Sequence, residues 1–246
     1  MRLYGKNSVI ERLRTNPQSV SKIYVELGVK LGAALHSKAK QHGIPIVNIP
    51  QTKMAKIGRT KNTQGVMIDI NSFEYAEYDA LIENCHKNKR CPVFLDAMKD
   101  PQNLGAIIRS LACLGKFAVV LPTHDSVEVT EAALRVASGG ENYVPIAKVA
   151  NINKALKKAK DLGFWLAGAV VQGGKPLEET EFPLPIALVV GSEQKGIRDV
   201  VKQSLDLEVT IPMSAETISF NAAHAATILC YEITRQKIIR KKEKPS

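Results

Sequence analysis

The second half of the chain alternates short apolar runs with amphipathic segments of helical period. Six runs have the length and apolar content of buried strands, at residues 92–97, 117–121, 145–149, 164–170, 186–190 and 207–211. Apolar spacing predicts five helices between and after them, at residues 104–114, 128–138, 153–162, 197–204 and 221–241. Near-continuous apolar strands that alternate with helices are typical of a mostly parallel sheet covered on both faces. We therefore predict an α/β fold for residues 91–246.

The first part of the chain predicts a smaller α/β module over residues 1–72. Its pattern indicates helices at residues 7–15 and 32–42 and strands at residues 22–27, 44–49 and 65–70. Residues 53–62 are basic and contain a glycine, so we expect a loop that touches phosphates there. Residues 73–90 are more polar, with a helix expected at 77–86, and form the predicted linker between the two domains.

Positive charge is concentrated at the two ends of the chain. The net charge is +10, and residues 1–70 alone carry 12 Lys and Arg against 3 Asp and Glu. Residues 235–246 carry 6 against 1, whereas residues 91–234 carry 13 against 16. An N-terminal module that docks on a phosphate backbone explains this distribution. The alternative is that surface lysines only keep the protein in solution.

Several classes of protein are disfavoured by composition. The longest apolar runs, such as residues 186–190, are far shorter than a membrane span, and the first residues lack an apolar signal core. We therefore expect a cytoplasmic protein without a membrane partner. The four cysteines form no CxxC pair and do not cluster with the histidines, which favours reduced thiols and no metal site.

Three separated segments carry candidate chemistry, because each follows an apolar strand. Ligands of open α/β sheets bind at the carboxyl ends of strands, so these three ends could converge on one site. In the first segment, Asn103 stands where a strand gives way to a helix, a position suited to an N-cap, and Gly105 allows close packing. Arg109 follows on the same helix and could reach a substrate. A capped helix with a surface arginine would explain the same residues.

The second and third segments follow the strands at residues 186–190 and 207–211. Gly191 and Gly196 border a turn where backbone could approach a ligand, although an ordinary strand-to-helix turn is the alternative. Their spacing is not GxGxxG, which weakens a dinucleotide-binding interpretation. In the third segment, Ser219 is the candidate N-cap of a long helix rich in small residues that could pack against a second subunit. His224 within it favours a packed or interfacial role over a catalytic one.

Taken together, these segments resemble the signature motifs of the SpoU (TrmH-like) family of RNA ribose 2′-O-methyltransferases. The first motif matches at Leu95, Asp96, Asp100, Pro101, Asn103, Gly105 and Arg109, and the second matches Gly-x-Glu-x-x-Gly at Gly191, Glu193 and Gly196. The third keeps Ser219 and Asn221 but has Phe220 for Leu and Ala222-Ala223 for Val-Ser. A fourth stretch, residues 136–145, has Glu141-Asn142 where the family often has Glu at the second position; Gly139 and Gly140 also read as a helix stop.

The resemblance implies a fold and a cofactor. Members have a trefoil-knotted α/β catalytic domain, which many of them carry behind a ribosomal-protein-like α/β domain that binds the RNA substrate. They bind S-adenosylmethionine in the knot and work as homodimers built through the catalytic domains. By matching positions, the residues expected to bind the cofactor are Leu121, Gly191, Ile211, Met213, Phe220 and Asn221.

The resemblance also implies a reaction, the transfer of a methyl group to a ribose 2′-hydroxyl of RNA. Arg109 would favour the alkoxide, while Asn103, Glu193, Ser219 and Asn221 would position it, the substrate or the loops. The leading hypothesis is a guanosine in large-subunit ribosomal RNA. The alternatives are a tRNA 2′-O-methyltransferase and a non-catalytic RNA-binding or ribosome-assembly protein. A nucleotide-dependent oxidoreductase fits the strand pattern but lacks the glycine fingerprint.

Overall fold

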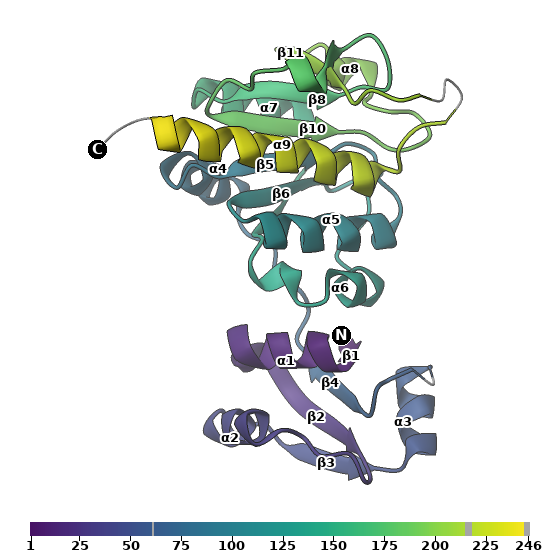
Figure 1. The fold of residues 1–246 in the computed structure, drawn as a ribbon. Coiled ribbons are helices and arrows are strands. Elements are labelled where there is room, and N and C mark those ends of the chain that lie inside the picture. Colours follow the sequence, from purple (N-terminus) through teal and green to yellow (C-terminus); the bar gives the residue numbers. More distant parts are fainter. Residues whose placement is uncertain (61, 215–217, 244–246) are drawn as a thin grey trace.

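Two β-sheets, one formed within residues 2–70 and one within residues 91–210, organise the protein (Figure 1). The structure is a computed structural model that describes residues 1–60, 62–214 and 218–243. The first sheet has four strands in the order β1-β4-β2-β3 and the second has seven in the order β7-β6-β5-β10-β8-β11-β9. All pairings in the seven-stranded sheet are parallel. The α/β class and the parallel sheet predicted from the sequence are confirmed.

The N-terminal sheet matches the predicted pattern closely. Its strands are β1 (Arg2–Tyr4), β2 (Val20–Glu26), β3 (Ile46–Ile49) and β4 (Val66–Ile70), with helices α1 (Lys6–Thr15) and α2 (Ala33–Gln41) packed nearby. The sequence pattern missed β1, which has only three residues. The expected basic loop at residues 53–62 was wrong for its first half, since α3 (Gln51–Gly58) is a helix. Met54 and Ile57 lie three residues apart and pack against Ile49 and Met67, so one apolar face holds the helix and its lysines point outward.

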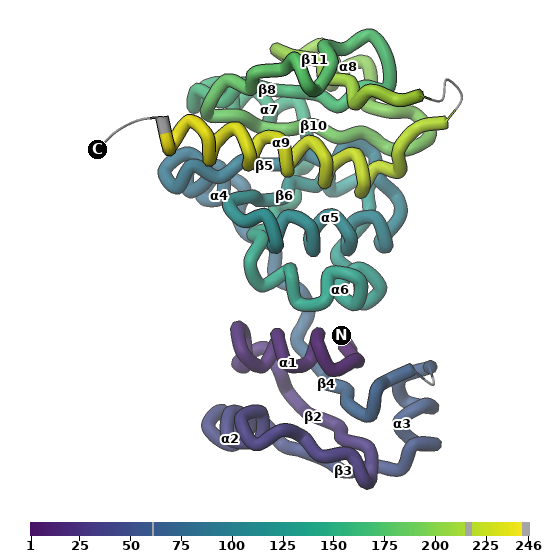
Figure 2. Tube along the Cα trace, in the orientation of Figure 1, coloured from purple at the N-terminus to yellow at the C-terminus, as the bar shows by residue number. Residues whose placement is uncertain are grey.

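The C-terminal sheet carries its helices on both faces. Its strands are β5 (Cys91–Leu95), β6 (Phe117–Pro122), β7 (Ile146–Val149), β8 (Trp165–Ala169), β9 (Lys175–Pro176), β10 (Ile186–Val190) and β11 (Leu207–Thr210). Its helices are α4 (Tyr78–Lys87), α5 (Pro101–Leu114), α6 (Glu131–Ala137), α7 (Ile152–Asp161), α8 (Asp199–Lys202) and α9 (Ala222–Glu243). The trace in Figure 2 shows β10 running between β5 and β8, which precede it in the chain by very different distances. The expected helix at 197–204 is shorter than predicted.

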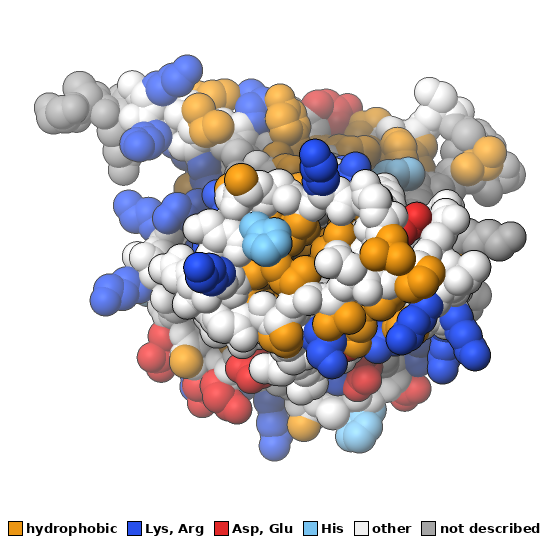
Figure 3. Space-filling view, turned by 90° about the horizontal axis from the view of Figure 1, so that it is seen from below, with side chains coloured by type: hydrophobic (Ala, Val, Ile, Leu, Met, Phe, Trp, Pro, Cys, Tyr) orange, Lys and Arg blue, Asp and Glu red, His pale blue; other side chains and the backbone are white. Residues whose placement is uncertain are grey.

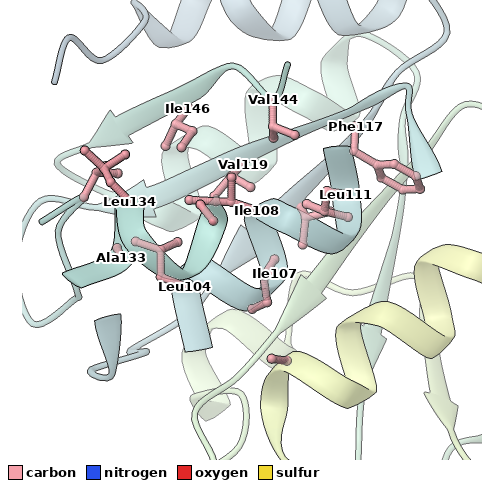
Figure 4. Close-up of a cluster of buried hydrophobic side chains, with 14 of the residues drawn as sticks. Leu104, Ile107, Ile108, Leu111, Phe117, Val119, Ala133, Leu134, Val144 and Ile146 are labelled. Carbon is pink, nitrogen blue, oxygen red and sulfur yellow. The ribbon is translucent and has the colours of Figure 1, made fainter. Parts of the chain in front are cut away.

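Strand side chains alternate between the two layers of helices. On β5, Val93 and Leu95 join the cluster under α5, α6 and α9, whereas Phe94 joins the cluster under α4 and α7. Figure 4 shows the first cluster, in which Ile108 and Leu111 of α5 point toward Val119 on the sheet. Helix α4 lies in the segment predicted as a linker, yet it packs on this sheet. No helix among the described residues is long and apolar enough to cross a membrane.

The two domains meet through α1 and the turn that follows α6. Arg12 of α1 donates from Nη2 to Oε1 of Glu141 at 2.9 Å, and both side chains are almost completely buried. Burial raises the pKa of Glu141 and lowers that of Arg12, while their mutual attraction opposes both shifts. A Cβ on Gly139 (φ +94°) would stand 2.5 Å from the Glu11 side chain, so only glycine lets α1 approach this turn. The domains therefore contact each other at a polar, closely packed junction.

Breaking this buried ion pair from one side should cost more stability than removing it altogether. Arg12 Nε and Glu141 Oε2 have no hydrogen-bond partner among the described residues, so the pair is incompletely satisfied. We expect Arg12→Met to lower the free energy of unfolding by about 3–5 kcal/mol, because it leaves a buried carboxylate unpaired. The double variant Arg12→Met/Glu141→Leu should recover most of that loss. Urea unfolding of both single variants and the double variant measures the coupling; equal losses in Arg12→Met and the double variant would refute it.

Candidate active site

Side chains from all three motif segments meet at one end of the seven-stranded sheet. Asn103 of α5 donates from Nδ2 to Oε1 of Glu193, which follows β10. Asn221, which precedes α9, donates from Nδ2 to Oδ1 of Asn103 at 2.9 Å. Asn103 therefore bridges residues that are 90 and 118 positions away in the chain. The convergence expected from three strand ends is present, and Asn103 is its centre.

Helix α5 begins earlier than the sequence suggested, and this changes the role of Asn103. The helix starts at Pro101, and Asp100 is its N-cap, accepting a hydrogen bond from the backbone N–H of Gln102 at 2.8 Å. The prediction of Asn103 as the N-cap was therefore wrong. Asn103 lies in the first turn of the helix, which leaves its amide free to bridge the other two segments. Proline is favoured at the first helical position, which explains why the helix includes it.

Arg109 lies on the same helix and is exposed. None of the described residues forms a hydrogen bond or an ion pair with its guanidinium, so the side chain can reach an external group. The backbone at Arg109 is held by the turn that follows α6, since a Cβ on Gly140 of that turn would lie 3.1 Å from the Arg109 Cα. Gly105 packs even more closely, with 2.4 Å from such a Cβ to the carbonyl oxygen of Ala133 in α6. The helix that carries Arg109 is thus rigidly held while the side chain itself is free.

The loop after β10 closes on itself through two glycines. A Cβ on Gly191 would lie 2.0 Å from the carbonyl carbon of Gly196, and Gly196 has a positive φ of 65°. Ser192 and Gly196 exchange backbone hydrogen bonds of 3.2 and 2.8 Å across the turn. The two glycines therefore bring two backbone segments of the turn together, and Glu193 lies between them; their approach to a ligand stays a prediction.

A buried carboxylate anchors the far side of this loop. Asp96, fully buried at the end of β5, accepts hydrogen bonds from Arg198 at its backbone N (2.9 Å), Nε (2.9 Å) and Nη2 (2.6 Å). These hydrogen bonds raise the pKa of Arg198. Three charge-assisted bonds to one carboxylate hold Arg198, and with it the end of the loop, against β5. In the sequence, Asp96 is visible only as part of the first motif, and no pattern there points to Arg198.

The third segment is capped by a different residue from the one predicted. Oδ1 of Asn221 accepts a hydrogen bond from the backbone N–H of Ala223 at 2.9 Å, so Asn221 caps α9 and Ser219, the predicted N-cap, does not. The same amide both starts the helix and donates to Asn103. The small residues at the start of α9 lie against α5, where Thr227 donates to Ser110 at 2.9 Å. His224 is exposed on this helix.

A pocket opens beside this trio at the carboxyl ends of β8, β10 and β11. Its lining residues are Ala169, Val170, Val171, Val190, Gly191, Ser192, Glu193, Gly196, Val209, Ile211, Met213, Ser219, Phe220, Ala222 and Ala225. Four of the six residues expected to bind a cofactor are among them: Gly191, Ile211, Met213 and Phe220. Leu121 is instead buried within β6, and the Asn221 side chain is engaged with Asn103. The sequence did not identify residues 169–171 as a wall of this pocket. Their only signal in the sequence is their position at the end of a predicted strand.

A glycine-bordered apolar pocket at the carboxyl edge of a parallel sheet, next to a polar trio, defines a ligand-binding α/β protein of the open-sheet class. Residues 90–231 match the model of the SpoU rRNA Methylase family. Residues 2–76 match the model described as RNA 2′-O ribose methyltransferase substrate binding. The chain belongs to the SpoU family of RNA methyltransferases.

Relatives and solved structures agree with this assignment. A Bacillus subtilis protein named as a TrmH family tRNA/rRNA methyltransferase, YacO, is 32% identical over 95% of this chain and 94% of its own. An uncharacterized tRNA/rRNA methyltransferase of Mycobacterium ulcerans is 35% identical over 95% of this chain and 76% of its own. The fold is shared with the SpoU methyltransferase AviRb of Streptomyces viridochromogenes in complex with S-adenosylmethionine, with a TM-score of 0.80, 20% identity, and coverage of 97% and 91%.

Proposed function

We propose that this protein transfers a methyl group from S-adenosylmethionine to a ribose 2′-hydroxyl of RNA, at a guanosine in large-subunit ribosomal RNA. The observation that carries the proposal is the Glu193–Asn103–Asn221 trio, which joins the pocket to the helix bearing an exposed Arg109. The trio links the residues of all three motifs in one hydrogen-bonded chain. Its place beside the pocket supports a reaction between a ligand held there and a substrate that Arg109 reaches.

The pocket suits an adenosine-containing ligand, and SpoU methyltransferases use S-adenosylmethionine, which supplies an activated methyl group when bound. Val190, Val209 and Ile211 offer apolar walls for a flat base, and Phe220, 41% exposed, stands at the rim. The backbone of Gly191 and Gly196 approaches without side chains, as recognition by backbone groups requires. In this proposal Leu121, Gly191, Ile211, Met213, Phe220 and Asn221 remain the predicted cofactor-binding residues.

The protein's own residues would act mainly through electrostatics and positioning. A ribose hydroxyl must lose its proton before its oxygen attacks the methyl carbon, so the site has to favour an alkoxide. A guanidinium stays protonated in proteins, which suits Arg109 for holding a phosphate and stabilising that negative charge rather than for removing the proton. Asn103, Glu193, Ser219 and Asn221 would position the substrate or the two loops around the helix that carries Arg109.

The N-terminal domain supplies a surface for the RNA. Lys53, Lys56 and Arg59 of α3 and its C-terminal end line a shallow cavity together with Arg2 and Tyr24. Lys and Arg side chains gather over parts of this domain in Figure 3, which views the molecule from its N-terminal side. Cations beside an aromatic ring match a partner that offers phosphates and bases. We divide the chain into an RNA-binding domain (1–72), a linker (73–90) and a knotted methyltransferase domain (91–246).

The exposed face of α9 supports a homodimer built through the catalytic domains. Tyr231 and Ile238 are 58% and 52% exposed, and with His224 they follow a spacing of seven residues along one side of the helix. The helix begins next to Asn221 of the trio, so a second copy bound along this side would lie close to the site. We expect sedimentation to give a dimer and Tyr231→Glu to shift it to a monomer at the same concentration. A parent protein that sediments as a monomer would contradict this.

The reaction is tested by transfer of tritiated methyl from S-adenosylmethionine to unmodified ribosomal RNA and, separately, to tRNA, followed by nucleoside analysis. Labelled 2′-O-methylguanosine from the ribosomal RNA alone is the expected result. Selective labelling of tRNA would replace our substrate with the tRNA alternative. S-adenosylmethionine binding without transfer to either RNA would point to an assembling particle as substrate. Absence of both S-adenosylmethionine binding and methyl transfer would favour the non-catalytic RNA-binding protein.

A further inference from the structure

A second basic surface lies on the catalytic domain, at the end of α9. It is formed by two segments, the end of α4 with the loop before β5 and the last turns of α9, and we call it the tail surface. Its cations are Lys87, Lys89, Arg90, Arg235, Lys237, Arg240, Lys241 and Lys242. Residues 87–90 and 235–242 contain no Asp or Glu. The tail surface is therefore one place where positive charge accumulates on a slightly acidic catalytic domain.

Direct contacts bring the two segments together. Lys237 donates from Nζ to the carbonyl oxygen of Lys89 at 3.4 Å and also lies 5.9 Å from the centre of the Phe117 ring. Arg90 donates from Nη1 to the carbonyl oxygen of the same Phe117 at 3.1 Å. Figure 1 shows the end of α9 and the end of α4 on the same side of the molecule. The shared position is thus set by the fold and not by sequence proximity.

Most of these cations have no internal anion among the described residues, whereas six of the 13 Lys and Arg residues in the segment 91–234 are paired within the domain. Elsewhere Lys99, Lys148, Lys158, Lys160, Arg198 and Lys202 are each in an ion pair with a carboxylate. On the tail surface, Arg235 pairs with Glu232, and none of the other seven is in an ion pair with a described residue. Lys87, Lys89, Lys241 and Lys242 are exposed. Uncompensated charge held at one place is suited to an external polyanion.

The position of the tail surface decides which polyanion it fits. Helix α9 starts beside the site at Asn221 and runs for 22 residues, which at 1.5 Å per residue places the cations of its last turns about 20–30 Å away. We propose that the tail surface binds the phosphate backbone of the RNA substrate at a point remote from the methylated nucleotide. The inference rests on the proposed function, since it assigns the surface to the same RNA. Only a structured RNA long enough to span that distance would engage both places.

An anionic membrane is the other polyanion that a basic helix end could meet. Ile239 is exposed near the cations, as an interfacial helix would require, whereas Ile238 belongs to the side of α9 proposed above for the dimer contact. However, Leu229 and Ile233 are buried in the core, so the main apolar face of α9 is not available for insertion. Three of the eight cations of the tail surface also come from residues 87–90 and not from this helix. These features favour RNA.

The test replaces exposed cations without touching the contacts that hold the surface together. The variant Lys87→Gln/Lys89→Gln/Lys241→Gln/Lys242→Gln keeps Lys237, Arg90 and Arg240 in place. Its matched control, Lys154→Gln/Lys157→Gln, removes two exposed lysines of α7 in the same domain. Affinity for transcribed large-subunit ribosomal RNA and for tRNA is measured by filter binding between about 50 and 200 mM salt. Vesicles with anionic lipids are the third probe.

We expect the quadruple variant to bind RNA at least about tenfold more weakly, with a salt slope lower by about 3, since each lost phosphate contact removes about 0.7–0.9. The control should match the parent. Methyl transfer should show a raised KM for RNA and an unchanged kcat. An unchanged RNA affinity and an unchanged salt slope in the quadruple variant would overturn the proposal. A loss of vesicle binding with RNA binding unchanged would overturn it as well. If the salt slope for RNA binding differs between parent and quadruple variant but the parent transfers no methyl group, the tail surface binds RNA and the proposed reaction is wrong.

Discussion

Replacing Arg109 by alanine should lower the rate of methyl transfer by about 10²–10³-fold while leaving S-adenosylmethionine affinity unchanged. Removing one preorganised donor aimed at developing negative charge costs about that much in other enzymes. Arg109 is exposed and forms no hydrogen bond or ion pair with a described residue, so its loss should not disturb the fold. Its helix is held independently, through the packing of Gly105 on α6 and of Gly140 on α5. Single-turnover rates with saturating RNA and calorimetric binding of S-adenosylmethionine measure the two quantities.

The matched variant Arg109→Lys separates charge from geometry. A lysine keeps the positive charge but cannot make the forked hydrogen bonds of a guanidinium to a phosphate. We expect it to retain part of the rate if Arg109 acts by charge, and to resemble alanine if the fork is essential. A rate for Arg109→Ala equal to that of the parent would remove Arg109 from the catalytic machinery. An equal loss of rate and cofactor affinity would instead indicate that the helix had shifted.

The parts of the fold that the sequence predicted are those fixed by local pattern. The strands at residues 117–121 and 186–190 are uniformly apolar because both faces of the sheet are covered, and such runs are visible without any structure. Helix α3 escaped prediction because only Met54 and Ile57 hold it, among residues that look like a basic loop. The ends of α5 and α9 were misplaced because several polar residues in each segment can cap a helix. Asp100 and Asn221 take those roles, which only the backbone geometry decides.

The candidate site was predictable in its membership but not in its connections. Topology alone brings three strand ends to one edge, so Asn103, Glu193 and Asn221 could be expected near each other. That Asn103 bridges the other two depends on side-chain directions that no spacing rule supplies. The Asp96–Arg198 and Arg12–Glu141 pairs join residues 102 and 129 positions apart, and either carboxylate could have been a surface charge. Burial turns them into anchors, and burial is a property of the assembled fold.

One consequence of these anchors is that the two domains are not independent of the site. The turn at Gly139 and Gly140 contacts Glu11 of the N-terminal domain on one side and the backbone of Arg109 on the other. The neighbouring Glu141 is held by Arg12. A displacement of the N-terminal domain would therefore be felt at the helix that carries Arg109. Under the proposed function, this arrangement would align an RNA contact of the N-terminal domain with the ribose that Arg109 reaches.

Gly191→Ala should weaken the binding of S-adenosylmethionine by at least about 100-fold, or about 2.7 kcal/mol. The new Cβ would meet backbone atoms, 2.0 Å from the Gly196 carbonyl carbon and 2.2 Å from the Ile197 nitrogen. Unlike the tip of a side chain, these atoms cannot move without opening the turn that shapes the pocket wall. Overpacking of this kind costs about 1–3 kcal/mol, so the melting temperature should fall as well.

Two other glycines show whether crowding or backbone conformation is responsible. Gly196 has a positive φ of 65° but open space around it, so Gly196→Ala should cost only the left-handed conformation, about 1 kcal/mol. Gly32, with φ −54° and nothing within 4 Å of a Cβ, should tolerate alanine without effect. Calorimetric titration and thermal unfolding of the three variants measure the loss of cofactor affinity and of stability. If the close approach of Gly191 to Gly196 shapes the cofactor site, the loss is largest for Gly191→Ala, smaller for Gly196→Ala and absent for Gly32→Ala. If Gly191→Ala binds the cofactor with normal affinity, the cofactor site lies elsewhere. The substitution would open the turn that forms this wall of the pocket, so a cofactor bound there would lose affinity.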